Sequence, residues 1–252
     1  MTAQEVLTKN VEDQIALVTL NRPDQANSLN RALFLAIRHE MEELENDDSV
    51  RVIVMTGAGK KAFCAGVDLK ERAQMSESKI LSDRERVVRP CFNAIKGVTK
   101  PIIAAVNGVA LGGGAELALI CDIRVASKNA RFGQTEIKWG MIPACGACQR
   151  LRMIVGIGRA KEIILTGRVM EAEEAFRLGI YNIVVSEGDL MEEAKRLASE
   201  IAKNSPIAVK QAKKAIDIGA SISEGLDFEF EASKECYFAG GAITGPQKFK
   251  SS

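Results

Sequence analysis

Short apolar runs alternate with amphipathic stretches through about residue 185. Residues 5–20 predict a β-hairpin with its turn at Glu12-Asp13. Further along, Leu33, Ile37, Met41 and Leu44 recur at helical spacing, and we expect this helix to be capped near Asn27 or Ser28. Continuous apolar runs predict buried strands at residues 51–56, 101–106 and 122–126. Residues 78–97 predict another helix. This alternation indicates an α/β domain.

The composition of the chain changes in its last third. Residues 189–203, 206–219 and 222–238 have the apolar spacing of helices and few strand signals. We therefore expect two regions: an α/β core with the active site over residues 1–188, and a helical C-terminal region over residues 189–252.

Charge and composition narrow the chemistry. The 252 residues carry a formal net charge of +1, which gives no broad field to attract nucleic acid or anionic lipid. The single histidine, His39, lies between Arg38 and Glu40 on a predicted solvent face, so a multi-histidine metal site is excluded and acid–base chemistry falls to other groups. The sequence has no apolar run of about 18 residues and no signal or transit peptide, and its six cysteines lie mostly among apolar neighbours. We expect a cytoplasmic protein with reduced thiols.

Two glycine-containing segments follow predicted strands. They are residues 62–69 and residues 107–114, the second of which ends in three consecutive glycines. Glycines let a ligand approach the backbone, and a following helix presents its first N–H groups, so the second segment can form an oxyanion site. From the glycines alone, a tight and closely packed turn is the simpler explanation. Neither segment has the spacing of a dinucleotide-binding or P-loop motif.

Two glutamates stand beside these segments. Glu116 lies in an apolar stretch in the first turn of the helix after the glycines, and Glu136 follows 20 residues later. A buried carboxylate is costly unless its pKa is adjusted or it has partners. Most single glutamates are solvated, but a pair beside a candidate oxyanion site can divide the roles of acid and base.

Four segments together closely resemble the enoyl-CoA hydratase, or crotonase, family over about residues 17–216. They are Phe63-Cys64-Ala65-Gly66-Val67-Asp68-Leu69-Lys70, Ala104 to Leu117, Cys121-Asp122-Ile123-Arg124 and Phe132-Gly133-Gln134-Thr135-Glu136. The resemblance implies a ββα superhelix core followed by a helical trimerisation region. It also implies an acyl-CoA thioester substrate, no metal, no separate cofactor and no membrane, with a homotrimer or a dimer of trimers as the assembly.

The resemblance also assigns roles to residues of this chain. It places the two oxyanion donors on the backbone N–H groups of Val67 and Gly113. Glu116 would activate the water that attacks C3, and Glu136 would act as the acid toward C2. The residues that match the CoA-binding loop are Ala65, Asp68, Leu69 and Lys70, with Lys61 near the phosphates. The acyl pocket would draw on segments such as 72–92 and 138–148.

Two segments depart from the family pattern. Residues 143–148, Pro-Ala-Cys-Gly-Ala-Cys, replace a glycine-rich Pro-Gly-x-Gly-Gly-Thr, a change that touches the loop after Glu136 and the acyl pocket. The tail after about Ala239 differs from the charged terminal helix that the family uses toward CoA and a neighbouring subunit.

Three alternatives compete with hydration. Cys145 and Cys148 form a C-x-x-C at a predicted helix start, as in thiol oxidoreductases, although two small residues in glycine-sized space explain them better. One branch of the family binds RNA through a lysine-rich helix. The corresponding segment here has two arginines against six acids, a net −4, so we expect no nucleic-acid partner.

The third alternative is another crotonase reaction, such as methylglutaconyl-CoA hydration, isomerisation or a different acyl-CoA lyase activity. Isomerases of the family manage with one carboxylate, whereas both glutamates are present here. The sequence therefore predicts an enoyl-CoA hydratase, a hydro-lyase that reversibly adds water to 2-trans-enoyl-CoA to give 3-hydroxyacyl-CoA in fatty acid or amino acid degradation.

Overall fold

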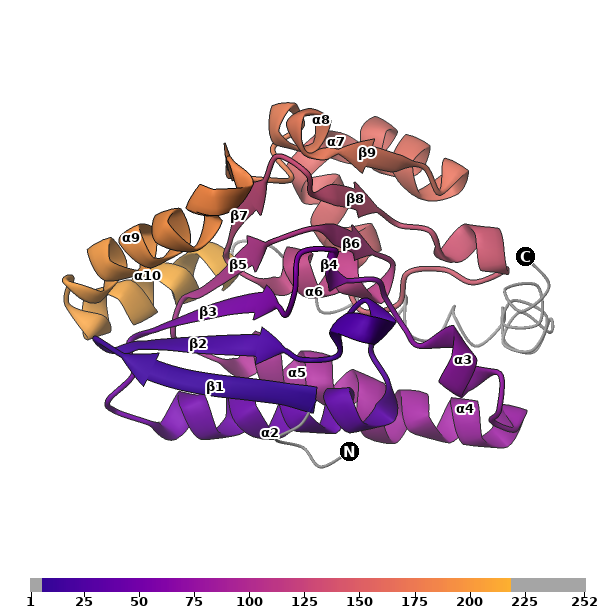
Figure 1. Ribbon diagram of the computed structural model, residues 1–252, viewed down its shortest axis with the longest axis horizontal. Coiled ribbons are helices and arrows are strands. Elements are labelled where there is room, and N and C mark those ends of the chain that lie inside the picture. Colours follow the sequence, from indigo (N-terminus) through magenta and orange to yellow (C-terminus); the bar gives the residue numbers. More distant parts are fainter. Residues whose placement is uncertain (1–5, 219–252) are drawn as a thin grey trace.

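The structure is a computed structural model that describes residues 6–218 (Figure 1). The strands are β1 (Leu7–Glu12), β2 (Ile15–Leu20), β3 (Val52–Gly57), β4 (Ala62–Cys64), β5 (Ile102–Val106), β6 (Val109–Leu111), β7 (Ile123–Ser127), β8 (Arg131–Gly133), β9 (Val169–Glu171) and β10 (Ile183–Val185). The helices are α2 (Arg31–Asn46), α3 (Leu69–Arg72), α4 (Glu77–Asp83), α5 (Arg89–Gly97), α6 (Gly113–Ile120), α7 (Ala147–Thr166, broken at Gly156), α8 (Ala172–Arg177), α9 (Leu190–Ala202) and α10 (Pro206–Ile218). Short 3₁₀ turns are η1 (Pro23–Gln25), η3 (Glu136–Trp139) and η4 (Glu187–Asp189), and η2 (Arg84–Val88) is a π-helical segment.

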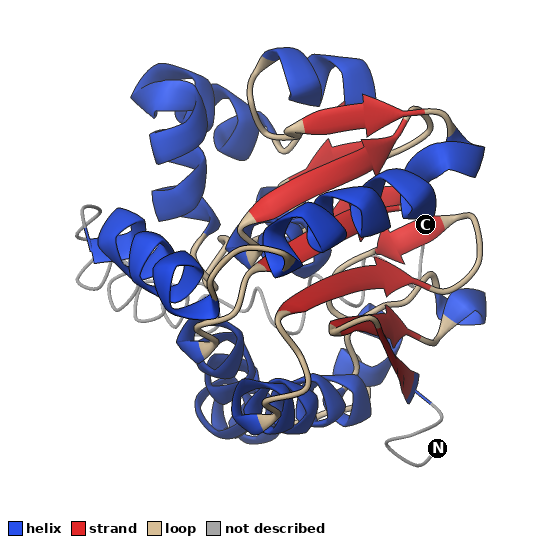
Figure 2. Ribbon diagram, turned by 90° about the vertical axis from the view of Figure 1, so that its left-hand side faces the viewer, coloured by secondary structure: helices blue, strands red, loops and turns tan. Residues whose placement is uncertain are grey.

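The larger sheet has six strands in the order β1-β2-β3-β5-β7-β10, all parallel except for the β1–β2 hairpin. The strands β3 and β5 are buried at every position because helices cover both faces of the sheet (Figure 2). Ile53 and Met55 pack in the cluster that includes α2, α5 and α6, whereas Val52 and Val54 pack against α9. The strands predicted at 15–20, 51–56, 101–106 and 122–126 are thereby confirmed.

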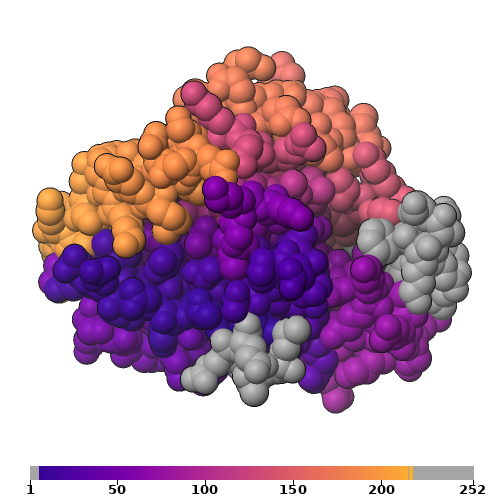
Figure 3. Space-filling view, viewed as in Figure 1, coloured from indigo at the N-terminus to yellow at the C-terminus, as the bar shows by residue number. Residues whose placement is uncertain are grey.

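The helix α9 belongs to this same core. Its buried residues Leu190, Ala194, Ala198 and Ala202 lie on β2, β3, β5 and β7, and Figure 3 shows the orange surface of this region against the indigo N-terminal strands. The division expected at residue 188 therefore does not separate α9 from the α/β core. The helix predicted at 222–238 and the tail after Ala239 lie outside the described residues.

The smaller sheet has four short strands in the order β4-β6-β8-β9, of which the first three are parallel. Each of these three strands follows a long strand of the larger sheet and precedes a helical segment, which gives the successive units β3-β4-α3, β5-β6-α6 and β7-β8-η3. This is the ββα arrangement that the resemblance implied, and the α/β class is confirmed.

Three local predictions need correction. The hairpin turn is Asp13-Gln14, both with positive φ, because Glu12 still pairs with Ile15. The cap of α2 is Asn30, whose side chain accepts the N–H of Leu33. Asn27 is instead a buried turn residue whose amide donates to the carbonyls of Ala58 and Ala62. The stretch 78–97 is helical but is divided into α4, η2 and α5.

Within residues 6–218, no helix is long and apolar enough to cross a membrane.

Candidate active site

The carboxyl ends of β4, β6 and β8 meet at one edge of the smaller sheet. Ligands of parallel α/β sheets bind at this kind of edge, because the turns that leave neighbouring strands converge there. Here the three turns bring Val67, Gly113 and Glu136 to one pocket, and α6 adds Glu116. These four residues, about 70 positions apart at the extremes, are thus adjacent in space for a topological reason.

Two glycines allow the turns to approach each other. Gly66 has φ +98°, and a Cβ at this position would lie 2.8 Å from the carbonyl oxygen of Leu111. At Gly114 a Cβ would lie 2.0 Å from the carbonyl oxygen of Cys64, so α6 rests directly on the end of β4. No L side chain fits either place without moving the backbone.

The backbone N–H groups of Val67 and Gly113 lie close together. A Cβ built on Gly66 would be 3.5 Å from the Gly113 nitrogen, and one on Gly113 would be 3.8 Å from the Val67 nitrogen. Leu29 holds the residues on either side of Val67, by accepting from Asp68 at 3.0 Å and donating to Gly66 at 2.7 Å. Within residues 6–218, neither the Val67 nor the Gly113 N–H has an acceptor. Two such donors beside a pocket can bind an oxyanion.

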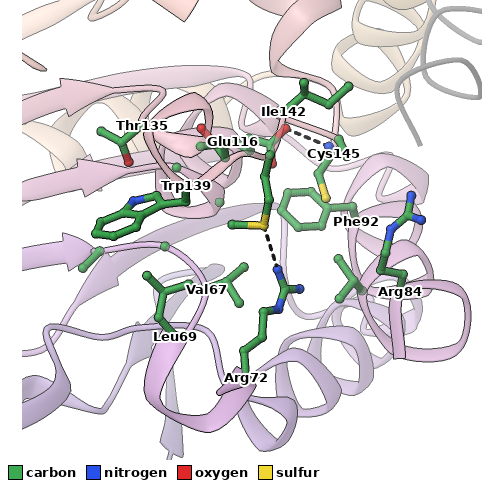
Figure 4. A pocket seen from close by; sticks show the side chains of 18 of the residues that line it. Val67, Leu69, Arg72, Arg84, Phe92, Glu116, Thr135, Trp139, Ile142 and Cys145 are labelled. Carbon is green, nitrogen blue, oxygen red and sulfur yellow. Dashed lines mark hydrogen bonds between the residues drawn. The ribbon is translucent and has the colours of Figure 1, made fainter. Parts of the chain in front are cut away.

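Glu116 is buried, with 4% of its surface exposed. Its Oε1 accepts the backbone N–H group of Cys145 at 2.7 Å (Figure 4), and it also accepts that of Ala147 at 3.2 Å. Burial raises the pKa of Glu116 to about 7, although both N–H bonds, the Arg150 charge and the Cys145 thiol favour the ionised form. The carboxyl group is therefore held in a fixed orientation and titrates near neutral pH.

Segment 143–148, which departs from the family pattern, thus contacts Glu116 through the backbone N–H groups of Cys145 and Ala147. Its turn at Gly146 has φ +112° and precedes α7, whose first N–H group, that of Ala147, donates to the carboxylate. A helix N-terminus stabilises negative charge. The sequence signal for this contact was a glycine before an apolar helix, which does not by itself identify the partner.

Glu136 is half-buried at the start of η3. The side-chain amide of Gln134, with its nitrogen turned toward Glu136, lies 3.2 Å from both carboxylate oxygens. Gln134 directly follows β8 and is fully buried. Because its side chain is held in place, it orients the Glu136 carboxylate at the edge of the pocket. Within the segment 132–136, nothing in the sequence distinguishes Gln134 from its neighbours.

The far end of the pocket is mostly apolar. Segments 72–92 and 138–148 do contribute to it, through Arg72, Arg84, Val88, Phe92, Trp139, Met141, Ile142, Ala144 and Cys145 (Figure 4). The pocket, which opens to the surface, has a volume of about 100 Å³, smaller than a cavity of about 150 Å³ that holds benzene. The space fits a short acyl group.

The residues expected at CoA fall into three groups. Ala65 and Leu69 line the pocket. The buried Asp68 carboxylate binds Arg22 at 2.8 Å and caps α3 by accepting the N–H groups of Lys70 and Glu71, so it holds the turn in place. Lys70 is exposed on α3, and Lys61 precedes β4, at the opposite end of that strand from the pocket.

Other polar residues lie outside this arrangement. His39 is 69% exposed and lies 3.2 Å from Glu43 on α2, as its position between Arg38 and Glu40 predicted. In the part of the chain that the structure describes, no group of three or more His, Cys, Asp or Glu side chains is placed to hold a metal ion.

Comparison with known proteins agrees with this geometry. Residues 10–239 match the enoyl-CoA hydratase/isomerase family. A short-chain-enoyl-CoA hydratase of Clostridium acetobutylicum is 44% identical over 90% of this chain and 87% of that protein. A crotonyl-CoA hydratase of Syntrophomonas wolfei is 38% identical over 93% of this chain and 91% of that protein. The crystal structure of an enoyl-CoA hydratase from Bacillus anthracis superposes with a TM-score of 0.83 at 40% identity, covering 98% of this chain and 96% of that one. The chain belongs to the enoyl-CoA hydratase/isomerase family.

Proposed function

We propose that this protein catalyses the reversible addition of water to a 2-trans-enoyl-CoA, giving a 3-hydroxyacyl-CoA. The observation that carries the proposal is the meeting of two carboxylates, Glu116 and Glu136, with two N–H donors, Val67 and Gly113, at one pocket. Both carboxylates favour hydration over double-bond isomerisation, for which one is enough.

The N–H groups of Val67 and Gly113 would bind the thioester oxygen. When water attacks C3, electrons move from the C2–C3 double bond toward this oxygen, which gains enolate character. Donors placed for that charge lower the barrier, and the loss of one such donor typically costs about 3 kcal/mol. Gly66 and Gly114 let the two turns that bear these donors approach each other, which supports their acting on one oxygen atom.

The two glutamates would handle the two proton transfers of the reaction. Glu116 orients the water and takes a proton as its oxygen bonds to C3, and Glu136 delivers a proton to C2. In each turnover the C2–C3 π bond, one O–H bond of water and the O–H bond of the Glu136 carboxyl break, while the C3–O bond, the C2–H bond and an O–H bond on Glu116 form. One proton then passes from Glu116 to Glu136 and restores the starting state. A pKa of about 7 for Glu116 suits this role, because a general base works best when its pKa lies near the working pH.

Ala65 and Leu69 would contact the thioester end of CoA, and Lys70 and Lys61 its phosphates. Asp68 would affect CoA binding indirectly, because its ion pair with Arg22 holds the turn that bears Ala65 and Leu69 in place. All the groups in this mechanism are side chains and backbone of the chain, so it uses no separate cofactor. The cytoplasmic location and the absence of a nucleic-acid partner stay predictions.

We also propose a homotrimer or a dimer of trimers. Support comes from exposed apolar side chains on α7, where Met153, Ile157 and Leu165 are 52%, 62% and 67% exposed. Large apolar groups gathered on one helix are typical of an interface. The mass in solution, measured by light scattering, tests this assembly.

The assay for the function follows the absorbance of the conjugated enoyl thioester with but-2-enoyl-CoA. We expect Glu116→Gln and Glu136→Gln each to lower kcat by about 10²- to 10⁴-fold, the usual contribution of a positioned acid or base. Glu173→Gln on α8, an exposed glutamate, is the matched control and should keep wild-type kcat. Wild-type kcat in either active-site variant would refute the two-carboxylate mechanism.

A further inference from the structure

A cysteine thiol lies in the same pocket as the two glutamates. Cys145 is half-buried and lines the cavity together with Glu116 and Phe92. Both of its backbone polar groups are held: its N–H donates to Glu116 Oε1 at 2.7 Å, and its carbonyl accepts Arg150 Nη1 at 3.0 Å. In Figure 4 its side chain extends from the Glu116 contact toward Phe92. The sulfur is therefore directed into the part of the pocket that takes the acyl chain.

The Cys145 thiol also interacts with the carboxylate of Glu116. It is one of the groups that favour the ionised form of Glu116, and the pKa of about 7 leaves about half of this carboxyl ionised at neutral pH. A thiol beside a base that other groups orient is the arrangement of an activated sulfur nucleophile. Here the orienting groups are the backbone N–H donors of Cys145 and Ala147.

The other described cysteines lack this combination. Burial raises the pKa of the Cys64 and Cys121 thiols to about 12 and raises that of Cys91 as well, and none of the three lines the pocket. Cys148 is half-buried, but its Sγ lies 3.8 Å from the carbonyl oxygen of Pro143, and it does not line the pocket either. Among residues 6–218, one cysteine thus combines a place in the pocket with a base.

The substrate of the proposed hydratase is an electrophile at C3, the carbon that water attacks. Any nucleophile that reaches C3 while Val67 and Gly113 hold the thioester oxygen meets the same lowered barrier. A thiol is a much stronger nucleophile than water once a base takes its proton, and a group held in the pocket gains further from proximity. Glu116 therefore serves two nucleophiles, the water molecule and the Cys145 thiol.

We propose that Cys145 adds to C3 of the bound 2-enoyl-CoA and forms a reversible covalent thioether with it. The inference rests on the proposed hydratase function, because it uses the same substrate and the same donors. The C2–C3 π bond, the S–H bond of Cys145 and the O–H bond of the Glu136 carboxyl break, while the S–C3 bond, the C2–H bond and an O–H bond on Glu116 form. The adduct occupies the pocket until elimination reverses these changes, so it removes enzyme from turnover while enoyl-CoA is abundant.

The test measures the intact mass of the protein after incubation with excess but-2-enoyl-CoA and an acid quench. We expect a mass increase equal to one whole but-2-enoyl-CoA per chain, located on Cys145 by peptide mapping. Cys145→Ser should lower the adduct fraction by at least about tenfold, because a hydroxyl group is a weak nucleophile at its ordinary pKa. Cys148→Ser removes a half-buried thiol from the same segment and is the matched control, which should keep the wild-type level of adduct. Butanoyl-CoA has no C2–C3 double bond and should give no adduct.

The pairing of thiol and base has its own variant. Glu116→Gln should form the adduct at least about 10²-fold more slowly, which is the lower end of the contribution of a positioned base. Formation at the wild-type rate would refute the pairing.

An unchanged mass in an enzyme that hydrates but-2-enoyl-CoA would overturn the inference and leave the hydratase function in place. An adduct without hydration would refute the hydratase function and support the covalent site. A mass increase of the acyl group alone would indicate attack at the thioester carbonyl and would overturn the inference, as would an adduct located on another cysteine. Should Cys145→Ser not fold, peptide mapping of the wild-type adduct decides the question.

Discussion

The strands of the larger and the smaller sheet alternate along the chain, but the two sheets have different roles. In the larger sheet, β3 and β5 have six and five residues, all of them buried between helices. In the smaller sheet, β6 and β8 have three residues each, and the turns after them bear Gly113 and Glu136. The first sheet supplies the core of the molecule, and the second places backbone and carboxylate groups at a common edge.

This difference indicates what each sheet tolerates. An apolar strand accepts another apolar residue of similar volume at modest cost. A turn that depends on a positive φ or on a close backbone approach accepts almost nothing else. We therefore expect changes in the turns to damage activity out of proportion to their size, and changes in the long strands to act on stability alone.

The largest effect is expected at the contact between α6 and β4. Gly114→Ala would place a methyl group 2.0 Å from the carbonyl oxygen of Cys64, so the helix start must move away from the strand. We expect a loss of about 4 kcal/mol in the free energy of unfolding, together with a large loss of kcat because Gly113 moves with it. Urea unfolding and the enoyl thioester assay measure both quantities.

Gly158→Ala is the matched control. Gly158 lies in α7, and a Cβ there meets nothing within 4 Å. Alanine favours helix by up to about 1 kcal/mol over glycine, so this variant should be as stable as the wild type or more so. Wild-type stability and activity in Gly114→Ala would mean that the two turns are not held by this contact.

The second effect concerns the buried ion pair under the oxyanion turn. Asp68→Asn leaves the Arg22 charge, with 8% of its side chain exposed, without its carboxylate. Breaking a buried pair in this way costs about 3 kcal/mol. Asp24→Asn, at an exposed site, should change stability by less than about 0.5 kcal/mol.

The pH dependence of stability identifies this pair. Burial favours the neutral acid, but the Arg22 hydrogen bond, the Glu71 N–H and the Arg22 charge outweigh it and lower the pKa of Asp68 below its ordinary 3.8. The stabilisation is therefore present above about pH 3.8 and is lost as the pH falls further through the lowered pKa. Denaturant unfolding of wild type and Asp68→Asn should converge in acid, and a constant difference at all pH values would contradict the assignment.

The third prediction is a gain in stability, whereas the first two are losses. Glu116→Gln should stabilise the protein at pH 8, because the wild type must keep a buried carboxylate ionised there. A rise of the pKa from 4.5 to about 7 corresponds to a gain of up to roughly 3 kcal/mol. The native state favours the protonated acid, so the wild type loses stability as the pH rises from 4.5 to 7, and the advantage of the variant should shrink toward pH 5. Unfolding at pH 5 and pH 8 measures it, and a variant less stable than the wild type at pH 8 would argue against the cost of the buried charge.

The contrast between the sheets also explains which strands can be predicted from the sequence and which cannot. Long runs such as 101–106 identify buried strands, because both faces are covered and no polar position interrupts the run. Three-residue strands such as β6 and β8 carry too few positions for a periodic signal. The smaller sheet was therefore found only in the structure, although the resemblance implied its ββα pattern.

At the site, residue reasoning singled out Glu116 and Glu136 as a pair and favoured a tight turn for the glycines, and the family motifs then assigned both their roles. The residues that hold the site residues in position are distant from them in sequence and could not be predicted. Cys145 lies 29 residues from Glu116, and Arg22 lies 46 residues from Asp68. Such contacts depend on the superhelical path of the chain, which no local pattern encodes.

The smallest expected effect returns to the larger sheet. Ile53 on β3 is fully buried in the cluster that includes α2 and α5, away from the pocket lining. Ile53→Val removes one methylene group and should cost about 1 kcal/mol in the free energy of unfolding. Because the turns of the smaller sheet keep their geometry, kcat and KM for but-2-enoyl-CoA should stay within about twofold of the wild type, less than the factor to which 1 kcal/mol corresponds. A fall in kcat without a fall in stability would show that the long strands take part in positioning the reacting groups, and the separation of roles between the two sheets would then have to be abandoned.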